Sequence, residues 1–506
     1  MFSKVKSAAI LGIDGYVVDV EVDVSSGLPA FDLVGLASSA VKESKERVRT
    51  AIKNSGYLFP VKRITINLAP ADIKKEGPGF DLPIAIGVLM CTGDISASPE
   101  ASLIIGELSL DGAVRGITGV LPIVYSAREL GIKKCIVPYD NAQEGALVSG
   151  VEVIGVKTLT ETVGYLNGAF DIAPAVARAS EYFQNDSEKE QLDFADVKGQ
   201  KCVKRALEIA AAGGHNIVMI GPPGSGKTMM ATALPGIMPE LSFDEAIEIT
   251  KIYSVAGRLD GGLIARRPFR TPHHTASGVA LIGGGRLAKP GEISLAHKGI
   301  LFLDELPEFP KSVLEVLRQP MEDRRVVVSR ASGTVVYPAD FMLVASMNPC
   351  PCGYLGTEKC NCTQHDIDRY LRRISGPLLD RIDIHIEASA VGYGDLNSNE
   401  SAECSADIRE RVLEAQRIQA RRYSGEGVLF NSQLSSKQAR KYCALGKEES
   451  DLLKHAFEGL GLSARAYSRV LKVARTAADL ESAGKVEAKH IAEAIGYRSL
   501  DRKYWR

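Results

Sequence analysis

A glycine-rich stretch in the middle of the chain has the residue types that bind nucleotide phosphates. It follows the pattern G-x-x-x-x-G-K-T and lies between an apolar segment, "IVMI", and a helix-like run. In such a loop backbone N–H groups converge on phosphate oxygens, a lysine reaches the β- and γ-phosphates, and a hydroxyl binds Mg²⁺. The stretch therefore predicts a nucleotide site. Its residues are Gly221, Pro222, Pro223, Gly224, Ser225, Gly226, Lys227 and Thr228.

Two further apolar segments end in polar residues that suit nucleotide hydrolysis. "ILFL" is followed by Asp304 and Glu305, and "FMLVASM" is followed by Asn348. Open α/β sheets bind ligands at the carboxyl ends of their strands. We expect Asp304 to hold Mg²⁺ through water, together with Thr228, and Glu305 to polarise the attacking water as a general base. Asn348 would orient water or contact the γ-phosphate.

Four of the nine cysteines lie close together, directly after Asn348. They are Cys350, Cys352, Cys360 and Cys362. Two C-x-C pairs with a glycine-containing connection can surround one tetrahedral zinc ion. His365 is an alternative ligand, and unligated thiols are the alternative interpretation. Four thiolates leave no open coordination position, so we expect a structural ion that braces the segment after Asn348, with the phosphate loop held separately by its own strand and helix.

Three basic stretches offer contacts to nucleic acid, whose phosphates supply most sequence-independent affinity. They are residues 265–274, 283–291 and 324–334, the last of which is predicted to form a β-hairpin. Arg286, Lys289 and Arg330 are the predicted DNA contacts. Solvated loop charges or contacts between subunits are the alternative. His273 and His274 have no acidic residue at ligand spacing, so we expect them to be structural or to contact DNA.

The elements that must position these residues indicate an α/β protein of several domains. A chain of 506 residues exceeds one ordinary hydrophobic core. Alternation of valine with acidic residues over 18–24 predicts a strand, as does alternation over 63–70, and residues 38–56 predict a helix. We expect four units. They are an α/β domain (1–170), a polar linker (171–193), a nucleotide-binding core with a parallel sheet (194–390) and a helical region (391–506).

Composition narrows the classes of partner. The chain is 45% hydrophobic and 24% charged, as in globular proteins, and its net charge of −1 means that nucleic acid must meet local basic patches. The apolar stretches fall short of the ~20 residues of a membrane helix. The first residues contain too short an apolar run for a signal peptide. We therefore expect a cytosolic protein without a membrane partner, in which thiols stay reduced.

Longer strings carry a resemblance to a known family. They are "GPPGSGKT", "RPFRTPHHTAS", "GGGRLAKPGEISLAHKGILFLDELPEF", "LRQPMEDRRVVVSRASGTVVYPADFMLVASMNPCPCG", "RISGPLLDRIDIHIE" and "LSARAYSRVLKVARTAADL". With these strings the chain resembles the Mg-chelatase-like AAA+ ATPases of the YifB/ComM family over nearly its whole length. The resemblance implies an N-terminal domain with the fold of the Lon protease catalytic domain. It also implies an AAA+ core with helix-2 and pre-sensor-1 insertions, and a helical lid.

The resemblance implies roles for individual residues as well. Asn348 becomes the sensor-1 residue, Arg381 a finger that reaches the ATP of a neighbouring subunit, and Arg465 the sensor-2 arginine. Arg469, one turn further along the same helical face, competes for that last role. The residue type of Arg381 alone leaves open whether it is a finger or an ordinary salt-bridge partner.

Proteolysis is not expected from the N-terminal domain. Lon-type domains carry a nucleophilic serine in a G-P-S-A-G loop and a downstream lysine as its base. The corresponding stretch here is "GPGFD", with Gly79 in place of the serine, and Leu121 stands about where the lysine would fall. Without this dyad no acyl-enzyme forms, so we expect a structural or interaction module.

The resemblance implies a hexameric helicase that uses ATP and Mg²⁺ to drive branch migration of recombination intermediates during natural transformation. Its partner would be branched or single-stranded DNA. Two alternatives remain from the shared core motifs. One is an ATP-powered subunit of a metal chelatase, and the other is a nucleotide-switched remodeller of a protein partner.

Overall fold

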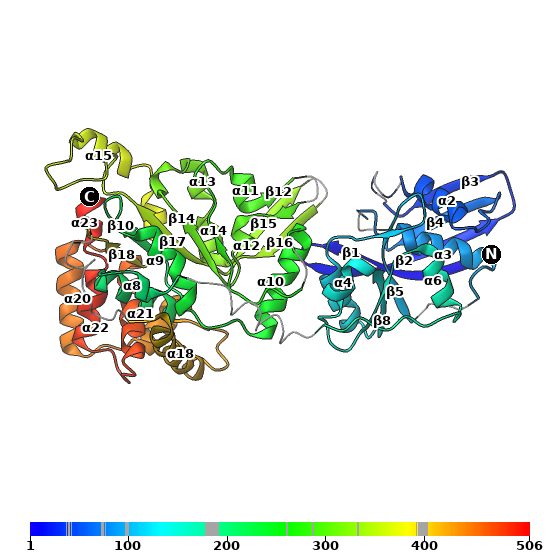
Figure 1. Cartoon of the computed structure of the whole chain (residues 1–506). Helices are drawn as coiled ribbons and strands as arrows, with labels where there is room; N and C mark the ends of the chain where they lie inside the picture. The colour runs from blue at the N-terminus through cyan, green and yellow to red at the C-terminus, as the bar shows by residue number, and fades with distance from the viewer. Residues whose placement is uncertain are drawn as a thin grey trace.

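The computed structural model describes residues 1–36, 38, 41, 43–71, 75, 77–96, 101–177, 192–259, 262–285, 288–330, 333–390, 392 and 403–505. These residues form an N-terminal α/β domain, a central α/β domain and a C-terminal group of helices. The N-terminal domain lies at one end of the molecule and the C-terminal helices at the other (Figure 1). The predicted α/β class is confirmed.

The N-terminal domain is built on a seven-stranded mixed sheet in the order β3-β4-β2-β1-β5-β8-β9. The strands are β1(Phe2–Leu11), β2(Asp14–Ser25), β3(Ala30–Val34), β4(Arg63–Ala69), β5(Ser102–Ile104), β8(Lys134–Pro138) and β9(Glu152–Val156). A separate hairpin joins β6(Glu107–Leu108) and β7(Val114–Arg115). The alternation over 18–24 forms part of β2, and Val18, Val20, Val22 and Val24 point into the core. The predicted strand at 63–70 is β4.

Helices cover this sheet. They are α2(Ser44–Asn54), α3(Asp81–Thr92), α4(Val120–Glu129), α5(Ala142–Gly145) and α6(Leu159–Leu166). The helix predicted over 38–56 is α2, which is shorter than predicted and runs from Ser44 to Asn54. Nearly every residue of α3 is buried, because the helix is apolar on all sides.

The central domain contains a five-stranded sheet in the order β11-β14-β17-β10-β18, in which all neighbours are parallel. The strands are β11(Phe269–Arg270), β14(Ile300–Leu303), β17(Met342–Met347), β10(Ile217–Ile220) and β18(Ile384–Glu387). The middle strands β14, β17 and β10 are buried at every residue, which explains their uninterrupted apolar sequences. The predicted parallel sheet is confirmed.

Helices and two hairpins complete the central domain. The helices are α8(Lys201–Gly213), α9(Lys227–Ala233), α10(Phe243–Ala256), α11(Gly278–Ile282), α12(Glu292–Leu295), α13(Lys311–Glu315), α14(Arg318–Asp323), α15(Gln364–Leu371) and α16(Gly376–Leu379). One hairpin pairs β12(Gly283–Gly284) with β13(Lys289–Pro290), and the other pairs β15(Arg325–Arg330) with β16(Gly333–Pro338). The second confirms the predicted hairpin. The Tyr337 hydroxyl donates to the Ala288 carbonyl at 2.7 Å and joins the two hairpins.

The C-terminal region is helical, as expected. Its helices are α18(Ser405–Arg422), α19(Ser436–Tyr442), α20(Lys447–Leu460), α21(Ala464–Leu480), α22(Ala488–Gly496) and α23(Leu500–Tyr504). Helices α18 and α21 pack against α8 and share one apolar core with the central sheet.

The N-terminal and central domains share a hydrophobic core. Leu103 and Val124 of the first domain belong to the same buried cluster as Ile247 and Ile249 of α10. Polar contacts surround it, since Glu144 Oε1 accepts from the Ser254 hydroxyl at 2.5 Å, and Lys251 Nζ lies 3.5 Å from the centre of the Tyr125 ring.

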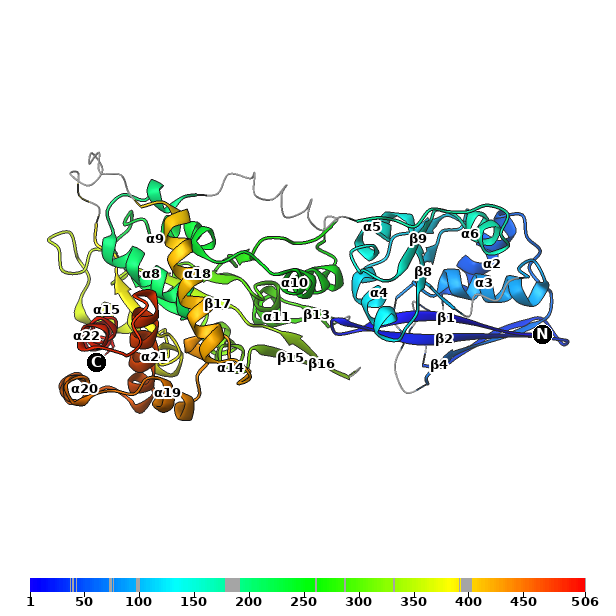
Figure 2. The same ribbon diagram turned by 90° about the horizontal axis from the view of Figure 1, so that it is seen from below.

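The end of the β1–β2 hairpin also meets the β15–β16 hairpin, with Gly12 against Val335 (Figure 2). Among the described residues, no helix has the length and apolar character needed to cross a membrane.

Candidate nucleotide-hydrolysis site

Three strands deliver the predicted hydrolytic residues to one edge of the sheet. The glycine-rich loop links β10 to α9, Asp304 and Glu305 follow β14, and Asn348 follows β17. The Thr228 hydroxyl donates to Asp304 Oδ2 at 3.0 Å, and the Ser346 hydroxyl also donates to Asp304. A hydroxyl and a carboxylate are thus in contact at the place where a magnesium ion would need oxygen ligands.

Lys227 lies folded over its own loop. Its Nζ donates to the carbonyl oxygens of Gly221 at 2.8 Å and Pro222 at 2.9 Å, and Asn348 Oδ1 is 3.4 Å away. Burial lowers the pKa of Lys227, while the charge of Asp304 acts in the opposite direction. The phosphate-binding lysine and the predicted sensor are therefore neighbours.

Glu305 adopts an unusual backbone conformation beside a histidine. Its φ is +53°, in the left-handed region that non-glycine residues seldom occupy. His274 Nδ1 lies 3.6 Å from Glu305 Oε2, and the His274 ring stands 4.1 Å from that of His273. No acidic residue lies at ligand spacing from these histidines in the sequence, but the fold brings Glu305 to His274. The partner is distant in sequence but follows the strand adjacent to β11.

Gln200 contacts the phosphate loop, although no sequence motif pointed to it. Its Nε2 donates to the carbonyl oxygens of Ser225 at 3.1 Å and Ser389 at 2.5 Å. It thereby ties the phosphate loop to the segment after β18. No motif marks a glutamine for this task, so only the fold could identify it.

Arg381 lies just before β18, at the amino ends of the parallel strands, whereas the phosphate loop lies at their carboxyl ends. Its guanidinium is held by Glu322 Oε1 at 2.7 Å and by the Pro377 carbonyl at 2.7 Å, and the residue is only 7% exposed. The four residues of β18, about 13 Å of strand, separate these amino ends from the phosphate loop. Arg381 is therefore remote from the nucleotide site of its own chain.

The two candidate sensor-2 arginines differ in their surroundings. Arg469 forms an ion pair with the buried Asp383 and donates to the Arg381 carbonyl at 3.1 Å. Burial opposes ionisation of Asp383, but Arg469 and His215 outweigh it and lower the pKa of this carboxyl. Arg465 is exposed in the first turn of α21. Arg469 is thus engaged in the fold, whereas Arg465 faces solvent.

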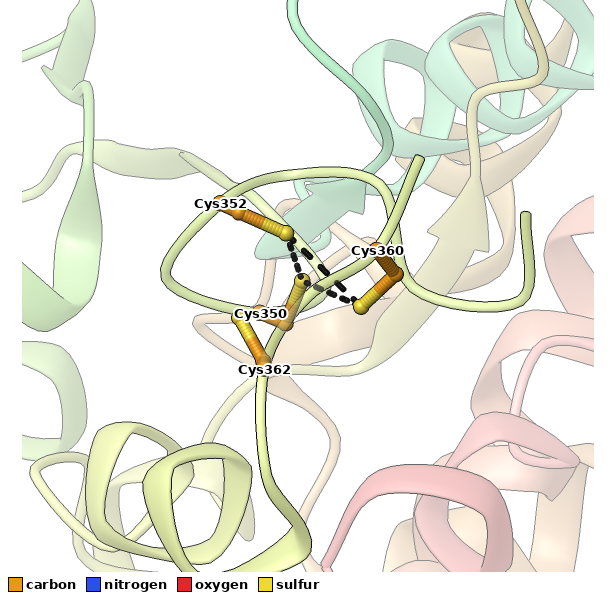
Figure 3. A group of neighbouring side chains, drawn as sticks. All are labelled: Cys350, Cys352, Cys360 and Cys362. Atoms are coloured by element: carbon orange, nitrogen blue, oxygen red, sulfur yellow. Dashed lines mark hydrogen bonds between the residues drawn. The ribbon is translucent and has the colours of Figure 1, made fainter. Parts of the chain in front are cut away.

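The four clustered cysteines converge in the loop between β17 and α15 (Figure 3). The Sγ atom of Cys350 is 3.4 Å from that of Cys352 and 3.9 Å from that of Cys360, and Cys352 and Cys360 are 3.7 Å apart. All four sulfurs, Cys362 included, lie within 4.8 Å of one another. Thiolates bound tetrahedrally at 2.3 Å from zinc stand about 3.8 Å apart. The cluster therefore fits a zinc ion.

The cysteine loop also touches the phosphate loop. Gly353 packs directly against the ring of Pro223, although the sequence suggested that the phosphate loop is held separately by its own strand and helix. Burial raises the pKa of Cys350 to about 12, whereas the backbone N–H of Tyr354 lowers that of Cys352 to about 6. His365, the alternative ligand, is exposed and lies outside the cluster.

Two of the three predicted DNA contacts, Lys289 and Arg330, belong to strands of the two joined hairpins. Lys289 is exposed in β13, and its Nζ donates to the Ala256 carbonyl at 3.3 Å. Arg330 ends β15, but its side chain lies outside the described residues, as does the whole of Arg286.

The degenerate protease loop of the N-terminal domain lines a cavity of about 380 Å³. Gly79, Ile117 and Thr118 contribute from this domain, and Lys289 and Tyr337 from the central one. Leu121 is fully buried in α4. The cavity is therefore shared between two domains.

Comparisons with known proteins agree with this architecture. Residues 193–396 match the family described as magnesium chelatase, subunit ChlI, residues 20–141 match subunit ChlI of Mg-chelatase, and residues 402–498 match its C-terminal part. Competence protein ComM of Haemophilus influenzae is 46% identical over 502 residues, which cover 98% of this chain and 97% of that protein.

Two further relatives extend the comparison. The uncharacterized protein YifB of Escherichia coli is 42% identical over 508 residues, 99% of this chain and 97% of that one. Lon protease 2 of Bacillus subtilis is 30% identical over 167 residues, 29% of this chain and 30% of that one. With a parallel-sheet nucleotide domain and relatives that align over nearly its full length, the chain belongs to the Mg-chelatase-like AAA+ proteins of the YifB/ComM family.

Proposed function

We propose that this protein is an ATP-driven DNA motor that acts as a hexameric ring and promotes branch migration of recombination intermediates. One observation carries the proposal. Lys227, Asp304 and Glu305 lie at the carboxyl ends of the parallel strands, and Arg381 lies at their amino ends. A finger in that position reaches the nucleotide of a neighbouring subunit, so complete sites form only between subunits.

The proposed chemistry is ATP hydrolysis with Mg²⁺, as the family implies. Lys227 binds the β- and γ-phosphates, and Thr228 and Asp304 hold the magnesium ion, which offsets phosphate charge. Glu305 polarises the attacking water and Asn348 contacts the γ-phosphate. In this proposal Arg381 acts on the nucleotide of the neighbouring subunit, and Arg465 is the sensor-2 arginine.

The proposed DNA contacts are Arg286, Lys289 and Arg330. The hairpins that bear Lys289 and Arg330 are joined by the Tyr337–Ala288 hydrogen bond, so they can act as one surface. A relative that is named as a competence protein supports a role in the handling of DNA.

The decisive experiment measures ATP hydrolysis by purified protein with and without single-stranded or branched DNA, followed by a branch-migration assay. We expect DNA to stimulate hydrolysis and ATP to drive migration, and Lys227→Ala to abolish both. ATP hydrolysis that DNA does not change would contradict the motor. It would favour the alternative of a chelatase-type subunit, which the family description supports, or a remodeller of a protein partner.

We further propose that Cys350, Cys352, Cys360 and Cys362 hold one structural zinc ion. The support is the spacing of the sulfurs, which brackets that of a tetrahedral thiolate site.

A further inference from the structure

The cysteine loop sits between two parts of the nucleotide site. Its first cysteine comes two residues after Asn348, which follows β17, and it ends at Thr363, whose side chain caps α15. The loop therefore runs from the residue predicted to sense the γ-phosphate to the start of α15.

The middle of the loop is pressed against the phosphate loop at Gly353. A Cβ atom at this position would lie 2.5 Å from Cδ and 2.9 Å from Cγ of Pro223, closer than real Cβ atoms approach. The Gly353 backbone thus lies so close to Pro223 that no side chain fits at position 353. It also lies next to Asn348, whose Cγ would be 3.7 Å away.

The cysteines of the cluster are direct neighbours of the residue that makes this contact. Gly353 directly follows Cys352, and its N–H donates to the Cys350 carbonyl at 3.0 Å. An ion that joins the pair Cys350 and Cys352 to the pair Cys360 and Cys362 fixes the turn that carries Gly353. Structural zinc contributes folding free energy to the segment that supplies its ligands.

We infer that zinc bound by the four cysteines sets the position of the phosphate loop through the Gly353–Pro223 contact. The ion is then a support of the nucleotide pocket and not only of its own loop. The inference rests on the proposed function in one respect, that residues 221–228 bind nucleotide.

Two glycine variants isolate the contact from backbone strain. Gly353 and Gly356 have nearly the same left-handed φ, +84° and +82°, but a Cβ at Gly356 meets nothing within 4 Å. Gly353→Ala and Gly356→Ala therefore carry similar strain, and only the first pushes on Pro223. We expect both to retain about one zinc per chain by elemental analysis. Gly353→Ala should bind a fluorescent ATP analogue at least about tenfold more weakly than Gly356→Ala.

A rescue variant separates the contact from general damage. Pro223→Ala removes the ring that the new methyl group meets, so Gly353→Ala combined with Pro223→Ala should bind the analogue as tightly as Pro223→Ala alone. Equal affinity of Gly353→Ala and Gly356→Ala would overturn the inference, as would a double variant no better than Gly353→Ala.

Removal of zinc tests directly whether the ion affects nucleotide binding. Cys360→Ser should lose zinc and bind the analogue more weakly, whereas Cys404→Ser, outside the cluster, should keep both. Chelation of wild-type zinc should weaken analogue binding, and Zn²⁺ alone should restore it. Wild-type protein without stoichiometric zinc after reducing purification would overturn the inference. If zinc and the glycine difference are both found but DNA leaves hydrolysis unchanged, the inference holds and the motor function fails.

Discussion

His274 Nδ1 stands 3.6 Å from Glu305 Oε2, at the point where the neighbouring strands β11 and β14 end. Glu305 is the residue proposed to polarise water, and its carboxylate is half exposed. His274 leads through Ser277, which caps α11, into the hairpin that carries Lys289. The contact therefore links the hydrolytic carboxylate to a proposed DNA-binding element.

His274→Ala should raise basal ATP hydrolysis and reduce its stimulation by DNA, because the Glu305 carboxylate is released from one partner. An exposed ion pair contributes at most about 1 kcal/mol, so the change should not exceed about fivefold. Steady-state hydrolysis measures it. The matched control is His273→Ala, since the structure pairs the His273 ring with Thr275 and not with Glu305. An equal effect of both variants would contradict this role for His274.

Glu305→Gln should bind ATP but hydrolyse it far more slowly, because an amide cannot accept the proton of the attacking water. Nucleotide binding and single-turnover hydrolysis measure the two steps separately. Lys227→Ala is the companion variant and should lose hydrolysis through loss of the phosphate clamp. Hydrolysis at the wild-type rate by Glu305→Gln would rule out Glu305 as the base.

Arg381→Ala should lose hydrolysis by about 10³-fold, as for other arginine fingers. Arg381 lies at the amino ends of the strands, away from the nucleotide site of its own chain. Rings that mix Arg381→Ala with Lys227→Ala chains should therefore regain part of the hydrolysis, at interfaces where an intact nucleotide site meets an intact finger. Glu322→Gln offers a control, since it removes the negative charge that holds Arg381 and leaves the finger present. Rings shown to contain both proteins, yet inactive, would count against a trans role.

Lys289→Ala should weaken DNA binding and lower the slope of log affinity against log salt concentration by about 0.9, the value for one lost phosphate contact. Fluorescence anisotropy over a range of salt concentrations measures the slope. Lys437→Ala, an exposed lysine of α19, is the matched control and should leave the slope unchanged. An unchanged slope in Lys289→Ala would remove this residue from the DNA surface.

Peptidase activity should be absent, because Gly79 supplies no nucleophile and Leu121 is buried without a titratable group. A fluorogenic casein assay with ATP checks this. Cleavage that depends on ATP and disappears when the N-terminal domain is altered would refute the prediction.

The sequence predicts those parts of the site that depend on local order along the chain. The phosphate loop, the acidic pair and Asn348 each follow a buried strand, so their meeting at one edge follows from parallel pairing. Contacts that depend on which strands become neighbours are different. The sequence does not reveal that β11 lies beside β14, and so it cannot show that His274 meets Glu305.

Packing between loops is equally hidden. The approach of Gly353 to Pro223 depends on side-chain shape at a place where two loops meet. A glycine in the sequence can indicate a turn, but it does not indicate which residue of another loop that turn will contact. The ion pair of Arg381 with Glu322 shows the same limit, because salt-bridge partners far apart in sequence leave no periodic pattern.

The apolar cluster that joins Leu103 and Val124 to Ile247 and Ile249 couples the stability of the two domains. Unfolding either domain alone would expose the buried face of the other to water, so we expect each domain to raise the free energy of unfolding of the other. The N-terminal domain, although it lacks the protease dyad, thus adds cooperativity to the nucleotide domain. Loss of its apolar face would lower the heat resistance of the domain that carries the phosphate loop.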